Sequence, residues 1–167
     1  MPYDLSKPLV IGISSRALFN LEQENKIFEE QGVEAYEAYQ VAHENEILQK
    51  GAAFQLIKAF LKLNNTGLGR LVEVIIMSRN NANTCLRIFN SIQYYGLDIT
   101  RATLTSGAEI APYLKAFKTD LFLSANSVDV QSAINDGIAA GLILTGAAHA
   151  DAKQKIDQIR IAFDGDA

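Results

Sequence analysis

The sequence predicts an α/β fold in three layers, with a doubly wound, mostly parallel sheet of Rossmann-like architecture. Short runs rich in branched apolar residues alternate along the chain with longer amphipathic segments. Helices of this length between strands require crossover connections, which in one sheet are parallel and right-handed in nearly all proteins. Small polar residues directly follow several apolar runs. These observations together indicate a sheet whose carboxyl edge carries polar side chains.

The first elements follow this pattern. Residues 8–13 form an apolar run and predict a buried strand that ends at Ser14. Residues 20–46 are charged and helix-favouring, and Gly32 interrupts them, which predicts two helices. Residues 52–63 carry apolar side chains at helical spacing and predict an amphipathic helix.

The later elements alternate in the same way. Residues 71–77 predict a second strong strand that ends at Ser78, and we expect a helix to begin on the asparagines that follow and to continue through residues 83–94. The remaining predicted elements are a strand at 99–104, a helix at 109–117, a strand at 121–123, a helix at 128–138, a strand at 142–144, a helix at 151–157 and a strand at 159–163.

Length and composition exclude several classes of protein. A chain of 167 residues fits a single domain. The net charge is -4 with both signs interspersed, so we expect no nucleic-acid partner. No apolar run of membrane-spanning length and no secretory signal is evident, and Cys85 is the single cysteine. We therefore expect a cytoplasmic protein without a membrane partner.

The sharpest motif is the Asp164-Gly165-Asp166 sequence after the apolar residues 159–163. Two carboxylates at this spacing on a strand exit can point at one Mg²⁺ ion, which offsets the repulsion between a carboxylate nucleophile and a phosphate. Phosphoryl transfer through an aspartyl phosphate uses such a pair. A solvated acidic terminus explains the same residues equally well.

Several blocks of the sequence resemble one family in the order in which that family carries them. The blocks are ISSRALFNLE, EQGVEAYEAYQ, HENE, INDGIAAGLIL and RIAFDGDA, and the similarity runs from Leu9 to Ala167. They resemble cytosolic type I 5'-nucleotidases of the haloacid dehalogenase superfamily, which dephosphorylate nucleoside 5'-monophosphates with Mg²⁺. The resemblance implies that Asp164 is the nucleophile, that Asp166 is the general acid and base, and that both are metal ligands.

The resemblance also implies where the catalytic residues lie along the chain. Residues 159–167 correspond to the first strand and Asp motif of a catalytic half whose other motifs are expected after Ala167. We expect residues 1–167 to form a single α/β domain with little or no turnover by itself.

The front of the chain repeats the plan of such a catalytic domain in degenerate form. Ser14 and Arg16 stand where two aspartates are expected, Ser78 stands where the second motif carries a hydroxyl, and Lys115 falls near the third motif. Ser124 and Asn126 replace carboxylates that hold Mg²⁺. We expect Ser14, Arg16, Ser78 and Lys115 to offer donors to a phosphate group.

Each of these residues has a simpler interpretation. Ser14 and Ser78 can cap helices, Arg16 can pair with a surface carboxylate, and Lys115 can be a solvated helix residue. His43 and His149 lack the spacing of a zinc site.

Two other functions stay open. The first is a non-catalytic module that binds nucleotides or a partner, and a second copy of the same chain, in a homo-oligomer, is one such partner. The second, weaker alternative is a phosphatase with Ser14 as nucleophile, although the sequence shows no base that could activate its hydroxyl.

Overall fold

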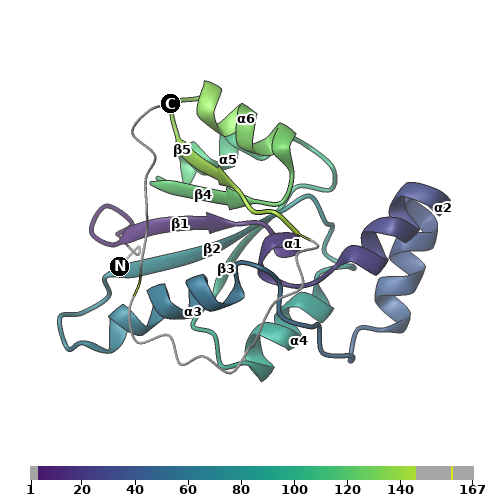
Figure 1. The fold of residues 1–167 in the computed structure, drawn as a ribbon, viewed down its shortest axis with the longest axis horizontal. Helices are drawn as coiled ribbons and strands as arrows, with labels where there is room; N and C mark the ends of the chain where they lie inside the picture. Colours follow the sequence, from purple (N-terminus) through teal and green to yellow (C-terminus); the bar gives the residue numbers. More distant parts are fainter. Residues whose placement is uncertain (1–3, 146–158, 160–167) are drawn as a thin grey trace.

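The computed structural model describes residues 4–145 and residue 159 (Figure 1). Its strands are β1 (Leu9–Ile13), β2 (Val72–Ser78), β3 (Arg101–Leu104), β4 (Leu121–Ser124) and β5 (Ala139–Leu142). Its helices are α1 (Ser15–Leu18), α2 (Glu22–Ala42), α3 (Phe54–Lys62), α4 (Leu86–Tyr94), α5 (Ala111–Ala116) and α6 (Ser127–Asn135), and a short 3-10 helix, η1, spans Leu63–Asn65.

The described strands pair in parallel in the order β3-β2-β1-β4-β5. The chain first winds from β1 outward to β3 and then returns to the other side of β1 for β4. This reversal creates a switch point between β1 and β4, outside which ligands bind in open parallel sheets. The predicted doubly wound α/β class is confirmed.

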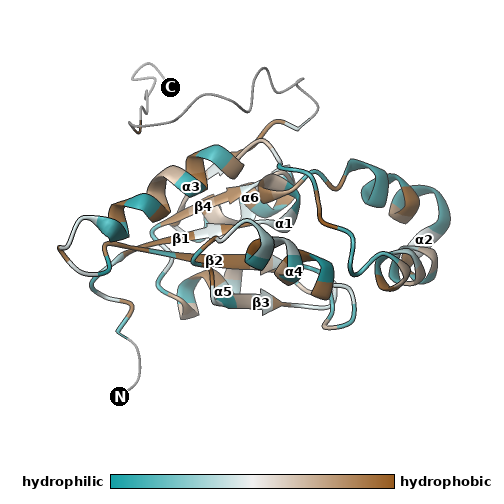
Figure 2. Cartoon of the chain, turned by 90° about the horizontal axis from the view of Figure 1, so that it is seen from below, coloured by the Kyte–Doolittle hydropathy of each residue, from teal (hydrophilic) through white to brown (hydrophobic). Residues whose placement is uncertain are grey.

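Helices cover both faces of the sheet because the strands are apolar on both sides. In β2, Val72, Val74 and Ile76 join a cluster with α3 and α4, whereas Ile75 and Met77 join a second cluster with α5 and α6. Figure 2 shows the strands as the apolar layer between these helices. The three predicted layers are therefore present.

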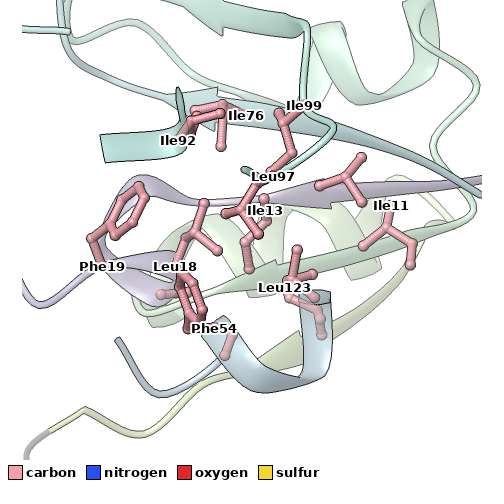
Figure 3. Close-up of a cluster of buried hydrophobic side chains, with 14 of the residues drawn as sticks. Ile11, Ile13, Leu18, Phe19, Phe54, Ile76, Ile92, Leu97, Ile99 and Leu123 are labelled. Atoms are coloured by element: carbon pink, nitrogen blue, oxygen red, sulfur yellow. The ribbon is translucent and has the colours of Figure 1, made fainter. Parts of the chain in front are cut away.

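The larger cluster lies under α1, α3 and α4 (Figure 3). Phe19 and Phe54 are fully buried there, and their ring centroids lie 6.2 Å apart. The rings hold the segment after β1 against α3. This packing fixes where the chain leaves the end of β1.

The helix α2 projects beyond the carboxyl ends of the strands (Figure 1). Gly32 interrupts it with φ of 84°, a left-handed conformation that glycine adopts at little cost. The predicted break at Gly32 is thus confirmed, and we call residues 22–42 the arm.

Several predicted boundaries differ from the structure, and three of them have a physical reason in its contacts. The fifth strand occupies Ala139–Leu142 rather than 142–144, because Ala139 pairs with Leu121 at the start of β4. Small residues suit this register, since a Cβ on Gly141 would lie 3.2 Å from Leu123 Cδ2.

The other two errors concern helix ends. Helix α4 begins at Leu86, not on the asparagines, because Asn81 Oδ1 accepts hydrogen bonds from the Asn83 and Thr84 amides and holds a turn there. Helix α6 ends at Asn135, and Gly137 follows with φ of 79°. The predicted helix at 151–157 and nearly all of the strand at 159–163 lie outside the described residues.

Candidate functional site

Polar residues gather at the carboxyl edge of the sheet. Four segments follow the ends of β1 to β4, and we call them the rim: residues 14–16, 78–81, 105–107 and 124–126. The sequence predicted Ser14 and Ser78 at the ends of their strands, and both lie in the rim. The sequence left the position of Arg16 open, and the structure places it in the rim as well. What each side chain does there depends on its partners.

Ser14 joins the loops that follow β1 and β4. Its amide donates to the Leu123 carbonyl at 2.9 Å, and its hydroxyl accepts from the Ala125 amide at 3.2 Å and the Ala17 amide at 3.3 Å. The second hydroxyl contact caps α1. Ser14 therefore spans the switch point, and its hydroxyl already has two donors.

Arg16 forms a two-pronged pair with the first turn of the arm. Its Nε and Nη2 atoms each lie 3.1 Å from a carboxylate oxygen of Glu22, and Nη1 donates to Asn25 Oδ1 at 2.9 Å. The hydrogen bond from Arg16 lowers the pKa of Glu22 below its ordinary value. The guanidinium fork is thus engaged by a carboxylate of the same chain.

Ser78 lies beside Ser15 at the end of β2. The two hydroxyl oxygens are 3.3 Å apart, and Ser78 Oγ also accepts from the Asn80 amide at 3.2 Å. Both side chains are buried. Ser78 caps a turn after the strand, because helix α4 starts only at Leu86.

Arg79 and Asp129 form a connection that the sequence interpretation missed. Arg79 donates through Nε to Asp129 Oδ1 at 3.1 Å and also through Nη2, and Asp129 is only 6% exposed. Arg79 Nη1 reaches the Gly107 carbonyl at 3.4 Å. One arginine therefore ties the loops after β2 and β3 to α6.

A local signal for half of this pair was present. Asn126 accepts from the Val128 and Asp129 amides and caps α6, so Asp129 falls in the first helical turn, where an acidic residue is favoured. The sequence contains no local sign of its partner, 50 residues away.

Lys115 lies away from the rim. It stands near the end of α5, ahead of the start of β4, and its Nζ is 3.2 Å from Asp136 Oδ2 just after α6. Both positions belong to the amino-terminal side of the sheet, because α5 and α6 run antiparallel to the strands they connect. The structure does not bring Lys115 together with Ser14, Arg16 and Ser78.

The arm contacts the rim through polar side chains. Tyr36 donates from its hydroxyl to Asn80 Oδ1 at 2.9 Å, and Asn81 donates to Glu37. Gln40 Nε2 donates to the Tyr36 hydroxyl at 3.0 Å. Burial raises the pKa of Tyr36, so its phenol stays protonated and can donate at neutral pH.

The described part of the rim does not suit a divalent cation. Hard cations require several oxygen ligands, among them carboxylates. Residues 4–145 and 159 contain no group of three or more acidic, histidine or cysteine side chains placed to hold a metal. The buried carboxylate of Asp129 is engaged by Arg79. Asp164 and Asp166 lie outside the described residues, so their predicted roles stay predictions.

No helix in the described part of the chain has the length and apolarity needed to cross a membrane.

The fold and the rim define a doubly wound α/β domain whose switch point is bridged by its own side chains. A family model described as 5'-nucleotidase matches residues 1–167, and the chain belongs to that family. The chain is 41% identical over 166 residues to human cytosolic 5'-nucleotidase 1B. This match covers 95% of the chain but 27% of the human protein. No solved structure gave a significant match.

Proposed function

We propose that this chain is the front part of a cytosolic enzyme that hydrolyses nucleoside 5'-monophosphates. Its described sheet is non-catalytic, and its residues Asp164 and Asp166 form the first catalytic motif. The observation that carries this proposal is the family match over the whole chain combined with the arrangement of the rim. Ser14 bridges the switch point, and the carboxylate of Asp129 is paired with Arg79. Because these polar groups of the rim are already engaged by partners in the same chain, they support a catalytic centre that lies outside the described sheet.

The proposed chemistry uses the two aspartates in turn. The carboxylate of Asp164 attacks phosphorus, forming an acyl phosphate, and the P–O bond to the nucleoside breaks. Asp166 gives the departing 5' oxygen its proton. The resulting Asp166 carboxylate then takes a proton from water, which attacks phosphorus and releases phosphate while regenerating Asp164.

Mg²⁺ is the proposed cofactor, and on this chain the carboxylate of Asp164 and the backbone carbonyl of Asp166 would hold it. When bound, it supplies positive charge that offsets the repulsion between the carboxylate and the phosphate. Ser14, Arg16 and Ser78 stay proposed phosphate contacts, whereas Lys115, on the amino-terminal side of the sheet, cannot join them at one phosphate group. Each of the three would have to exchange the protein partner it has in the structure for phosphate.

A chimera tests this proposal. The 167-residue chain is joined to the part of human cytosolic 5'-nucleotidase 1B that follows its matched segment, and phosphate release from AMP and IMP is measured with Mg²⁺. We expect turnover by the chimera, little or none by the chain alone, and none by the chimera with Asp164→Asn. The control is Asp136→Asn, which removes a surface carboxylate and leaves turnover unchanged. Full activity of the Asp164→Asn chimera would refute the assignment of Asp164 as the nucleophile.

A further inference from the structure

Gln40 and Tyr36 of the arm and Asn80 of the rim form a chain of hydrogen bonds. This hydrogen-bonded chain leaves one polar atom of each amide without a partner among the described residues. Gln40 Nε2 donates to the Tyr36 hydroxyl at 3.0 Å, and that hydroxyl donates to Asn80 Oδ1 at 2.9 Å. Gln40 Oε1 and Asn80 Nδ2 are buried and have no hydrogen-bond partner among the residues that the structure describes. Gln40 is 1% exposed, so solvent does not satisfy its free oxygen in this conformation.

Turning the amides around does not remove the deficit. If both amides are reversed, Asn80 donates to the Tyr36 hydroxyl and Tyr36 donates to Gln40, which leaves the Gln40 nitrogen and the Asn80 oxygen free. Reversing only Gln40 leaves one phenol proton for two amide oxygens, so one hydrogen bond is lost. Reversing only Asn80 makes both amides donate to the phenol oxygen and leaves the phenol proton unused. In the two arrangements that keep both bonds and use the phenol proton, the pair presents one unmet donor and one unmet acceptor.

The position of the pair favours a ligand over a purely structural role. Asn80 stands two residues beyond Ser78, at the carboxyl end of β2, and this end of a parallel sheet is where ligands bind in the fold. Tyr36 and Gln40 approach from the part of the arm after Gly32. The unmet groups therefore lie between two elements that join through side-chain hydrogen bonds.

We propose that Gln40 and Asn80, held in register by Tyr36, bind the edge of a nucleobase. Every nucleobase carries neighbouring donor and acceptor atoms on one edge. The free Gln40 oxygen and the free Asn80 nitrogen together supply the one acceptor and one donor that a single amide supplies to the amino group and ring nitrogen of adenine. A bound base supplies the acceptor and the donor that the protein leaves unmet. The choice of a base as ligand rests on the proposed function, in which nucleoside monophosphates are the substrates.

Entry of a base requires the arm to separate from the rim. Tyr36 with Asn80 and Glu37 with Asn81 are side-chain pairs that water can replace while the arm is open. The first part of the arm stays attached through the buried pair of Glu24 and Arg87. Gly32, between the two parts, tolerates a change of backbone angles.

Binding is measured on the 167-residue chain itself, without any assay of turnover. Adenosine, ribose 5-phosphate and inorganic phosphate are titrated by calorimetry, and the side-chain amide resonances of Gln40 and Asn80 are followed by NMR. We expect adenosine to bind and to shift both resonances, with ribose 5-phosphate and phosphate weaker by at least about tenfold. Tighter binding of phosphate than of adenosine would overturn the proposal, as would the absence of adenosine binding, which would leave water as the occupant.

Variants locate the binding site. Gln40→Leu and Asn80→Leu should each weaken adenosine binding by at least about tenfold, because each removes one of the two groups that face the base. Gln131→Leu is the matched control, since Gln131 is exposed on α6 and contacts Asn135. If a variant unfolds, the site is tested on the unsubstituted chain, by whether adenosine shifts the side-chain amide resonances of Gln40 and Asn80. If the chimera has no turnover but the chain binds adenosine, the proposed catalysis is refuted and this site is supported. If the chimera turns over substrate but the chain does not bind adenosine, only this site is refuted.

Discussion

The guanidinium of Arg87 lies 2.6 Å from the carboxylate of Glu24, and both side chains are more than nine-tenths buried. Glu24 belongs to the arm and Arg87 to α4, so the pair joins the arm to the body of the domain. Arg87 Nε also donates to the Glu46 carbonyl at 2.9 Å, where the chain returns from the arm. One side chain thus holds the start of the arm and the segment that follows the arm.

Replacing Arg87 should therefore destabilise the fold. Arg87→Met leaves the carboxylate of Glu24 buried without a partner, and we expect a loss of about 3–5 kcal/mol in the free energy of unfolding, measured by urea denaturation. Lys26→Ala is the control, because Lys26 and Glu30 form an exposed pair at 3.8 Å whose loss should cost at most about 0.5 kcal/mol. Similar small losses in both variants would contradict this assignment.

Gly51 should not tolerate a side chain. A Cβ there would lie 2.7 Å from the Ala17 carbonyl oxygen and 2.8 Å from the Leu18 and Phe19 carbonyl carbons, and backbone atoms cannot rotate away. We expect Gly51→Ala to cost about 3 kcal/mol, measured by thermal and urea unfolding. Gly67→Ala, in open space with φ of 81°, should cost only about 1 kcal/mol. Equal costs would show that the segment after the arm moves freely away from α1.

Ser14 should contribute to stability through its two hydrogen bonds. Ser14→Ala removes the cap of α1 and the contact with the Ala125 amide, and we expect a loss of about 1–2 kcal/mol in the free energy of unfolding. Ser6→Ala, at an exposed serine, should change it by less than about 0.5 kcal/mol. A Ser14→Ala variant that lost phosphate affinity at unchanged stability would instead support the predicted phosphate contact.

Stability should fall at alkaline pH. Burial raises the pKa of the Cys85 thiol and of the Tyr36 and Tyr95 phenols above their ordinary values of 9.0 and 10.0. Between the ordinary and the raised pKa values, the folded state holds these protons while the unfolded chain loses them. The contribution of the three groups to the free energy of unfolding is therefore complete below their ordinary pKa values and is lost as pH rises through the raised values.

Urea denaturation at several values between about pH 8 and pH 11 measures this loss. We expect Cys85→Ala and Tyr36→Phe each to flatten the alkaline decline, whereas Tyr94→Phe, at a phenol side chain that is 68% exposed, serves as the control. An identical decline in all three variants would mean that other groups cause it.

The sequence by itself determined the class of fold and the positions of most elements. Apolar runs at β1, β2 and β4, separated by amphipathic helices, require a parallel sheet, and the polar residues after them had to lie at its carboxyl edge. Gly32 marked the break in the arm for a local reason, its freedom to adopt positive φ. The family was also readable in the sequence blocks, which the comparison confirmed.

Only the tertiary structure decided which polar groups meet. Ser14 and Ala125 are 111 residues apart, Arg79 and Asp129 are 50 apart, and each pair depends on β4 returning beside β1. The position of β5 likewise depended on pairing with β4, not on its own apolar pattern. The physical reason is that periodicity records how each segment is buried, whereas contacts between distant segments follow from the order in which the strands assemble.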